Sequence, residues 1–183
     1  MDHQTVIDAT RCWISSMVIG LNLCPFAQRV FDGDQIRYVV SEAQDEPALL
    51  HDLANELNTL VAMPIETTET TLLIHPFAFA DFLDYNDFLG VAEQLVADLG
   101  LEGVIQIASF HPQYQFGDSA ADAVENYTNR SPYPMLHLLR EESIDAIAED
   151  EEKLLEIPER NIASLRALGL AKIMERIKAS RAP

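Results

Sequence analysis

The fold of this chain is decided by residues 103–140, GVIQIASFHPQYQFGDSAADAVENYTNRSPYPMLHLLR. The stretch opens with a largely apolar run at 104–108 that predicts a buried strand. His111-Pro112 ends this strand, and a long polar loop follows up to residue 134. Loops of this length are uncommon inside a compact domain unless they have a function or are disordered. Its aromatic residues argue against disorder, so we expect a folded loop at an active or binding site.

Strands alternate with helices on the N-terminal side of this stretch. Apolar periodicity predicts helices over residues 3–21, from Asp45 to Met63, and through 88–99 ahead of Gly100, with strands at 36–41 and 70–74. Strands joined by single helices indicate right-handed crossovers and a parallel sheet. We therefore expect an α/β fold in which helices flank a small, mainly parallel sheet.

The last third of the chain predicts helices only. Residues 134–147 would form a helix that carries His137 and Arg140 on one face. Between 141 and 159 the single basic residue is Lys153, whereas the segment after Pro158 is rich in arginine and lysine. An acidic helix followed by a basic one suggests an antiparallel C-terminal hairpin, with ion pairs each worth about 0.2–1 kcal/mol when exposed. The basic helix, 158–183, is either a solvated face or a contact surface for a homodimer.

Composition bounds the class of protein. At 183 residues, the chain fits one domain that spans 1–183. Twelve Lys and Arg against 30 Asp and Glu give a net charge of −18. Such a chain lacks the clustered cations that nucleic acid requires, and an anionic membrane surface would repel it. The charge is most simply explained by solubility.

The cellular setting is inferred from what the sequence lacks. The N-terminal residues do not resemble a secretory signal, and the apolar runs are shorter than the ~20 residues that span a bilayer. Two cysteines, Cys12 and Cys24, do not form a disulfide framework in a chain of this size. We expect a cytoplasmic protein with both thiols reduced.

Two histidines occupy matching positions in the predicted sheet. His75 and His111 each end an apolar strand, and a proline follows each of them. Ligands of parallel sheets bind beyond the carboxyl ends of the strands, so both imidazoles would face one crevice. Cys24-Pro25 has the same form. The alternative is that His-Pro merely terminates a strand and that Cys24 is a small buried hydrophobe.

Two chemistries fit these three side chains. In the first, Cys24, His75 and His111 bind zinc or another divalent metal, with His137 or a carboxylate such as Asp118 or Glu125 in support, and an open position activates water. No local metal-binding spacing supports this set. In the second, Cys24 is a nucleophile activated by a histidine, although its apolar neighbours would raise its pKa.

A second group of candidate residues lies in and after the loop. Arg130 and Arg140 stand out in a chain with so few cations, and an arginine fork binds carboxylate or phosphate through two hydrogen bonds. Tyr114, Asn126, Arg130, His137 and Arg140 are therefore predicted to bind a small anionic substrate. The alternatives are a helix salt bridge for Arg140 and loop bracing at 129–130.

Three segments carry a resemblance to a known family: 21–27 (LNLCPFA), 107–116 (IASFHPQYQF) and 125–134 (ENYTNRSPYP). Together they resemble the bacterial family catalogued as domain of unknown function 1415, over nearly the whole chain. The resemblance implies a bacterial protein of about this size and carries no activity with it.

The function that these observations favour is an enzyme acting on a small anionic metabolite. Its site would lie at the carboxyl ends of the strands, under the loop at 113–134, with the His and Cys residues as catalytic groups or metal ligands. The alternative is a non-catalytic binding or assembly protein that uses its C-terminal helices.

Overall fold

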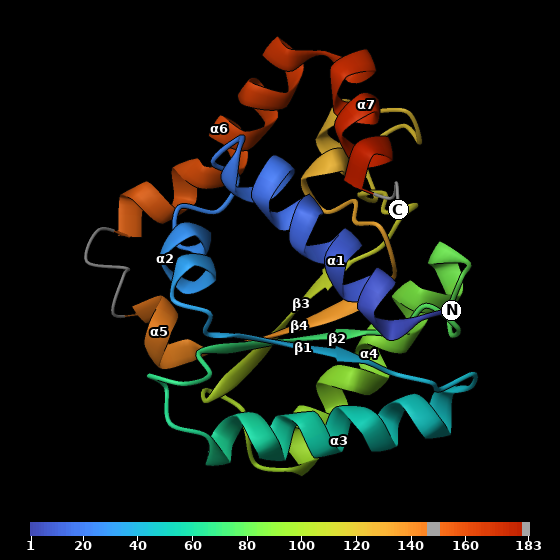
Figure 1. Cartoon of the computed structure of the whole chain (residues 1–183), viewed down its shortest axis with the longest axis vertical. Helices are drawn as coiled ribbons and strands as arrows, with labels where there is room; N and C mark the ends of the chain where they lie inside the picture. Colours follow the sequence, from blue (N-terminus) through green and yellow to red (C-terminus); the bar gives the residue numbers. More distant parts are fainter. Residues whose placement is uncertain (146–150, 181–183) are drawn as a thin grey trace.

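The computed structural model describes residues 1–145 and 151–180 and arranges them in three layers, with one sheet between two sets of helices (Figure 1). In chain order the elements are α1 (His3–Trp13), the π-helix η1 (Ile14–Ile19), α2 (Ala27–Asp32), β1 (Ile36–Val40), α3 (Glu46–Ala62), β2 (Thr70–Ile74), α4 (Phe82–Asp98), β3 (Ile105–Phe110), the 3₁₀ helix η2 (Val124–Thr128), β4 (Met135–Arg140), α5 (Glu141–Asp145), α6 (Glu151–Leu168) and α7 (Leu170–Ser180). The α/β class is therefore confirmed.

The sheet is mixed, which corrects the expectation of a mainly parallel one. Its order over the described residues is β1-β2-β4-β3. β1 pairs with β2 in parallel, whereas β4 pairs antiparallel with both β2 and β3. β2 and β3 consequently run in the same direction although they are not neighbours. Their carboxyl ends lie at one edge of the sheet.

β4 occupies residues that were predicted to be helical. Leucine, methionine and arginine favour helices by intrinsic propensity, and a short apolar run does not distinguish a strand from a buried helix. The gap between β2 and β3 decides the outcome, since both neighbours supply hydrogen-bonding partners. In a strand, residues three apart point to opposite faces. His137 and Arg140 therefore do not share a face.

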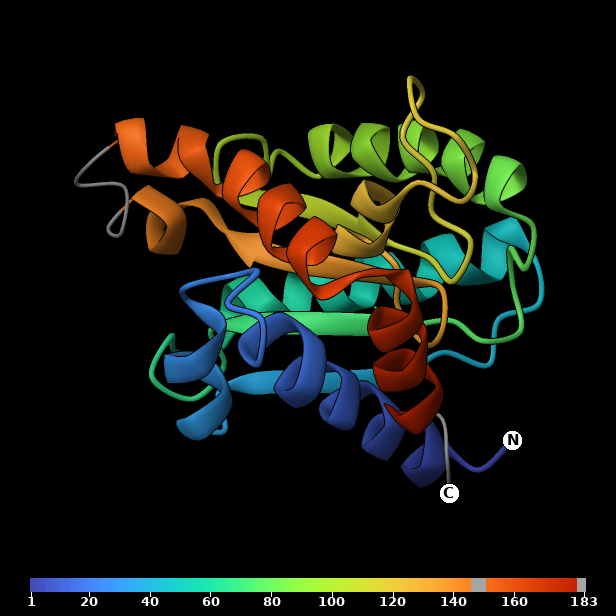
Figure 2. The same cartoon turned by 90° about the horizontal axis from the view of Figure 1, so that it is seen from above.

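α3 and α4 cover one face of the sheet (Figures 1 and 2). Asp45 caps α3 by accepting a hydrogen bond from the Ala48 amide, 3.0 Å away, as its sequence position predicts. The leucines of α3 recur at helical spacing and are fully buried against Leu73, Leu136 and Leu138 of the sheet: Leu49, Leu53, Leu57 and Leu60.

The opposite face carries α1, η1, α6, α7 and the loop that contains η2. Its core joins Trp13 and Met17 to Leu72, Ile74 and Met135 of the sheet. The helix predicted over 3–21 is confirmed, with a π-helical last turn. Asn22, in the left-handed region at φ 51°, ends it.

The C-terminal helices differ from the predicted hairpin in where they break. Pro158 lies inside α6, and the break comes at Gly169, whose φ of 83° suits a residue without a side chain. Arg160 donates to the Asn22 carbonyl at 2.9 Å, and Arg176 donates to the Ser16 carbonyl at 2.6 Å. Both helices are thus held on their own chain. The predicted ion pairs of the hairpin involve acidic side chains of residues 145–156, which are not among the side chains that the structure describes.

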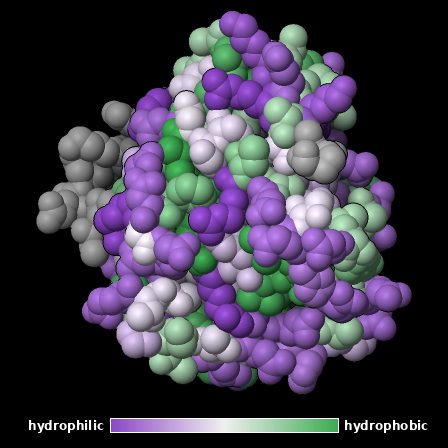
Figure 3. Space-filling model, in the orientation of Figure 1, coloured by the Kyte–Doolittle hydropathy of each residue, from purple (hydrophilic) through white to green (hydrophobic). Residues whose placement is uncertain are grey.

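The face of the molecule in Figure 3 is mostly hydrophilic, and its hydrophobic residues form small separate patches. This surface agrees with the excess of acidic residues in the composition. Across the part of the chain that the structure describes, we find no helix long and apolar enough to cross a membrane.

Candidate functional site

His75 and His111 meet at one edge of the sheet, where the sequence placed them. Each directly follows its strand, β2 or β3, and each is fully buried. The ring of Tyr85 from α4 separates them, with centroid distances of 5.7 Å to His75 and 5.1 Å to His111. The Tyr85 hydroxyl donates to the Met135 carbonyl at 2.9 Å and accepts the Phe110 amide at 3.1 Å. The imidazoles therefore share a packed core rather than an open crevice.

Hydrogen bonds to the backbone hold both imidazoles. His75 Nδ1 lies 3.1 Å from the Ala78 carbonyl, and His111 Nε2 lies 3.1 Å from the Phe79 carbonyl. Because a carbonyl only accepts, each of these nitrogens carries the proton. The Gln113 amide donates to His111 Nδ1 at 3.0 Å. Both nitrogens of His111 are thus engaged, whereas His75 Nε2 is buried without a partner.

Burial favours the neutral form of both rings by lowering the pKa of each. Desolvation, with a smaller effect of His111, lowers the pKa of His75 to about 4, against the Ala78 carbonyl, which raises it. Burial also lowers the pKa of His111, against the Phe79 carbonyl and Asp81, which raise it. As arranged, neither ring presents a free lone pair to solvent.

Cys24 does not join the histidines. It precedes α2, which lies toward the other end of the sheet from the heads of the β1 and β2 arrows (Figure 1). Burial raises the pKa of its thiol, while the amides of Phe26 and Ala27 and the charge of Arg160 lower it. The expected meeting of one sulfur with two imidazoles is not found.

The metal-ligand set suggested by the sequence is not assembled. Within residues 1–145 and 151–180, no group of three or more His, Cys, Asp or Glu side chains is arranged to hold a metal ion. Of the carboxylates named as further ligands, Asp118 is exposed, and Glu125 lies 3.6 Å from Arg166.

A pocket of about 400 Å³ opens beside the histidines, at the carboxyl ends of the strands. Its volume lies at the lower end of the range for small-molecule sites. Its lining comes from the start of α4 and from the loop after β3: Asp81, Phe82, Leu83, Pro112, Gln113, Gln115, Ala121 and Arg130. Two features that the sequence suggested for a site, the loop at 113–134 and Arg130, border this pocket. Sequence analysis missed the start of α4, whose only signal was its position after His75-Pro76.

Arg130 is the cation of this pocket, and its own loop fixes its position. Nε donates to the Tyr114 carbonyl at 3.1 Å, and one Nη atom donates to the Ala121 carbonyl at 2.6 Å. The guanidinium also lies over the ring of Tyr127, 4.4 Å from Cζ to the centroid. Among the described residues no carboxylate lies within ion-pair distance of it. These contacts use two of its five N–H groups, so a fork remains for a ligand.

Asn126 and Tyr114 build the loop that holds Arg130. The Asn126 side chain is fully buried; its oxygen accepts the Phe116 amide at 3.0 Å and the Ser119 hydroxyl at 2.6 Å, and its nitrogen donates to Ala120 at 2.8 Å. Tyr114 contributes its carbonyl to Arg130 and packs its ring on Phe116. The polar atoms of the Asn126 side chain are therefore all bound within the loop.

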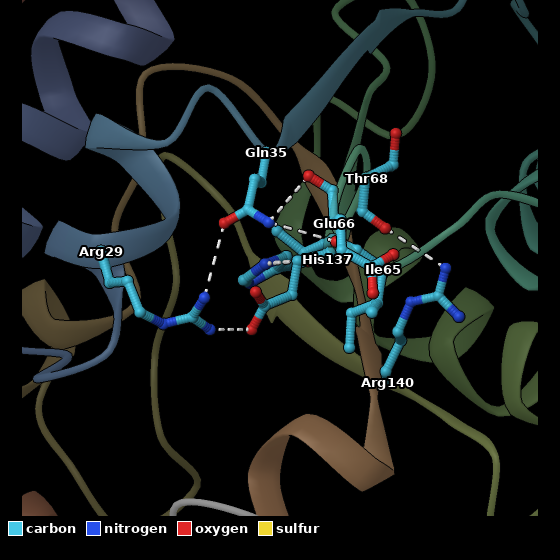
Figure 4. A network of polar contacts seen from close by, with 9 residues as sticks. Arg29, Gln35, Ile65, Glu66, Thr68, His137 and Arg140 are labelled. Atoms are coloured by element: carbon cyan, nitrogen blue, oxygen red, sulfur yellow. Dashed lines mark hydrogen bonds and ion pairs between the residues drawn. The ribbon is translucent and has the colours of Figure 1, made fainter.

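His137 and Arg140 lie in a different part of the molecule, within the network of polar contacts in Figure 4. The guanidinium of Arg140 is buried, and one Nη atom lies 2.5, 2.7 and 3.2 Å from the carbonyls of Leu60, Met63 and Thr68. His137 Nε2 lies 2.7 Å from the Thr70 hydroxyl, and burial lowers its pKa to about 4. Arg140 thus ties the end of α3 to the sheet.

A second hollow, of about 360 Å³, lies near this network. Arg29 lines it and pairs with the buried Glu69. Glu66 and Glu142 line it as well. With its one arginine already paired, this hollow does not suit an anion.

The fold and the arginine-bearing pocket define an α/β protein with a candidate small-ligand site at the carboxyl edge of a mixed sheet. The family model described as "Protein of unknown function (DUF1415)" matches residues 5–175, and the chain belongs to this family. No curated protein and no solved structure matches the chain.

Proposed function

We propose that the protein binds a small anionic metabolite in the pocket at the carboxyl edge of the sheet, with Arg130 holding its carboxylate or phosphate group. The observation that carries the proposal is that this guanidinium is fixed in position at the pocket and has no carboxylate partner among the described residues. Two backbone carbonyls and the Tyr127 ring fix it, it lines the pocket, and no described carboxylate neutralises it. A pre-positioned fork loses little side-chain entropy on binding.

An enzymatic step in this pocket would use His111 first. Pro112 and Gln113 line the pocket, and the Gln113 amide occupies His111 Nδ1. A shift of this one amide on ligand binding would free a nitrogen for proton transfer, whereas His75 lies behind Tyr85. We therefore place His111 ahead of His75 and Cys24 as the candidate acid–base group, and a metal-assisted step would need ligands that are not yet assembled.

The alternative, an assembly protein that works through its C-terminal helices, has less support. Arg160, Asn161 and Arg176 donate to backbone carbonyls of residues 16–23 of the same chain. These side chains are therefore committed within the protomer. A homodimer would have to use other parts of α6 and α7.

We also infer a reducing, cytoplasmic setting, in a bacterium as the family resemblance implies. Cys12 is exposed and Cys24 is free, so neither thiol is protected by a disulfide.

The test is a titration of the ¹⁵N-labelled full chain with inorganic phosphate and with acetate, followed by NMR. We expect shifts at the Arg130 side chain and at the amides of Gln113 and Gln115. Arg130→Gln should weaken binding about tenfold or more, because hydrogen bonds to charged groups are worth about 1.5–3 kcal/mol. Arg130→Lys keeps the charge but loses the fork, so its affinity should lie between those of the unaltered protein and Arg130→Gln.

Lys172→Gln provides the matched control, since it makes the same change of charge at an exposed position of α7. It should bind as the unaltered protein does. Absence of binding by any anion, or equal binding by Arg130→Gln and Lys172→Gln, would overturn the proposal.

A further inference from the structure

One aromatic side chain, that of Phe82, lines the Arg130 pocket, and ring contacts continue from it into the protein. Phe82 lines the pocket, and its ring lies 5.1 Å from that of Tyr114 and 5.5 Å from that of His111. Tyr114 in turn contacts Phe116 at 5.0 Å. Because the rings of Tyr114 and His111 hold the Phe82 ring, Phe82 presents a fixed apolar surface to the pocket.

Leu83 extends the apolar surface to the rim. It is 71% exposed, the most exposed of the large hydrophobic residues described in the chain. Its backbone cannot move away from the pocket easily, since its amide donates to the Asp81 carboxylate at 2.8 Å in the N-terminal cap of α4. Pro112 and Ala121 are also part of the lining. An apolar ligand group seated here would remove Leu83 from water.

Asp81 limits the charge that the pocket can accept. One oxygen of its carboxylate accepts the amides of Leu83 and Asp84, at 2.8 and 3.4 Å. No described side chain forms an ion pair with it, and it lines the same pocket as Arg130. A ligand with one negative charge can place it on Arg130, whereas a second negative charge would meet the Asp81 carboxylate and be repelled.

We propose that the ligand is a small amphipathic monocarboxylate, with its carboxylate on Arg130 and its apolar chain or ring against Phe82 and Leu83, and that Asp81 selects against a second negative charge. The inference rests on the proposed function, because it assumes that Arg130 binds an anion. It adds the chemical class of the rest of the ligand.

The experiment compares straight-chain acids of increasing length, acetate, butyrate and hexanoate, with the dianion succinate, again by NMR titration of the full chain. Affinity should rise with chain length, by up to about fourfold for each methylene that is fully buried. Succinate should bind more weakly than butyrate, which has the same number of carbon atoms.

Two variants assign these effects to residues. Leu83→Gln should lose most of the rise in affinity with chain length, and the high exposure of Leu83 makes a change in stability small. Met174→Gln, at a residue 54% exposed on α7, is the matched control and should keep the rise. Asp81→Asn should bind succinate more tightly, while asparagine still caps α4.

The outcomes separate this inference from the proposed function. If acetate binding depends on Arg130 but affinity is independent of chain length, or still rises in Leu83→Gln, the amphipathic ligand is excluded and the anion site stands. Succinate binding at least as tightly as butyrate to the unaltered protein would exclude the selection by Asp81. If no carboxylic acid binds but phosphate binds through Arg130, the monocarboxylate proposal fails and the anion site stands. If no anion binds at all, or if Arg130→Gln leaves binding unchanged, both proposals fail together.

Discussion

The guanidinium of Arg130 lies over the ring of Tyr127, with Cζ 4.4 Å from the ring centroid. The ring belongs to the core on the α1 side of the sheet, and Tyr127 itself is buried. A charge in the long loop is thereby fixed to the body of the fold at a point only three residues away. This contact, together with two carbonyls, gives the pocket a cation that is oriented before any ligand arrives.

Replacing Tyr127 should weaken anion binding without any change in the charge of the pocket. Tyr127→Phe keeps the ring face and should bind acetate as the unaltered protein does. Tyr127→Leu loses the cation–π contact, worth about 0.5–1 kcal/mol, and should bind roughly two- to fivefold more weakly. Titration of both variants under conditions where each is fully folded checks this, and equal affinities would show that the ring does not position Arg130.

Arg140 should prove structural. Its guanidinium is buried against carbonyls at the end of α3 and in the turn before β2, so Arg140→Met leaves these acceptors without a donor. We expect a loss of roughly 3 kcal/mol in the free energy of unfolding, measured by urea denaturation. The folded variant should bind acetate normally. Normal stability with lost anion binding would instead restore the substrate-binding role that the sequence suggested.

Much of the fold could be predicted because local signals agreed with the final structure. The cap at Asp45, the strand at Thr70–Ile74 and the C-terminal glycine at Gly100 were all inferred correctly. The prediction for the residues of β4 was wrong, because these residues by themselves favour a helix. Its strand conformation depends on β2 and β3, which lie far from it in sequence.

The candidate site could be predicted only in part, again because some of its features depend on residues far apart in sequence. His75 and His111 come together because strand direction fixes where strand ends lie, and that follows from the order of elements. The sequence gives no sign that Tyr85 separates their rings. Nor does it reveal that Arg130 lines a pocket whereas the guanidinium of Arg140 is buried against backbone carbonyls. Which arginine faces a pocket depends on packing rather than on residue type.

Burial of His75 should make stability depend on pH. Its folded pKa of about 4 lies below its ordinary value of 6.5, so the unfolded chain binds more protons between these two values. This contribution to stability is fully present above pH 6.5 and is lost as the pH falls toward 4. From pH 7 to pH 5 the loss should be roughly 2 kcal/mol.

His75→Asn isolates this contribution, because the asparagine amide can still donate to the Ala78 carbonyl that His75 Nδ1 contacts. Urea unfolding at pH 7 and pH 5 should show a smaller fall in the variant, by about the amount that His75 contributes, although its stability at pH 7 is also lower. An equal fall in both proteins would mean that His75 is already protonated, or free to be, in the folded state.

Asn126 should control the order of the whole loop, because its buried side chain joins residues 116, 119 and 120. Asn126→Ala leaves the Phe116 amide without its acceptor, and we expect a loss of about 1–3 kcal/mol. Amide hydrogen exchange should then speed up at Phe116 and across the loop, while β2 keeps its protection.

Asn58→Ala, at an exposed position of α3 where the side chain bonds only the Ala54 carbonyl, is the matched control and should change stability by no more than about 0.5 kcal/mol. Because Arg130 draws its two carbonyls from this loop, Asn126→Ala should also weaken acetate binding, and unchanged binding in a loosened loop would show that Tyr127 alone is enough to orient Arg130.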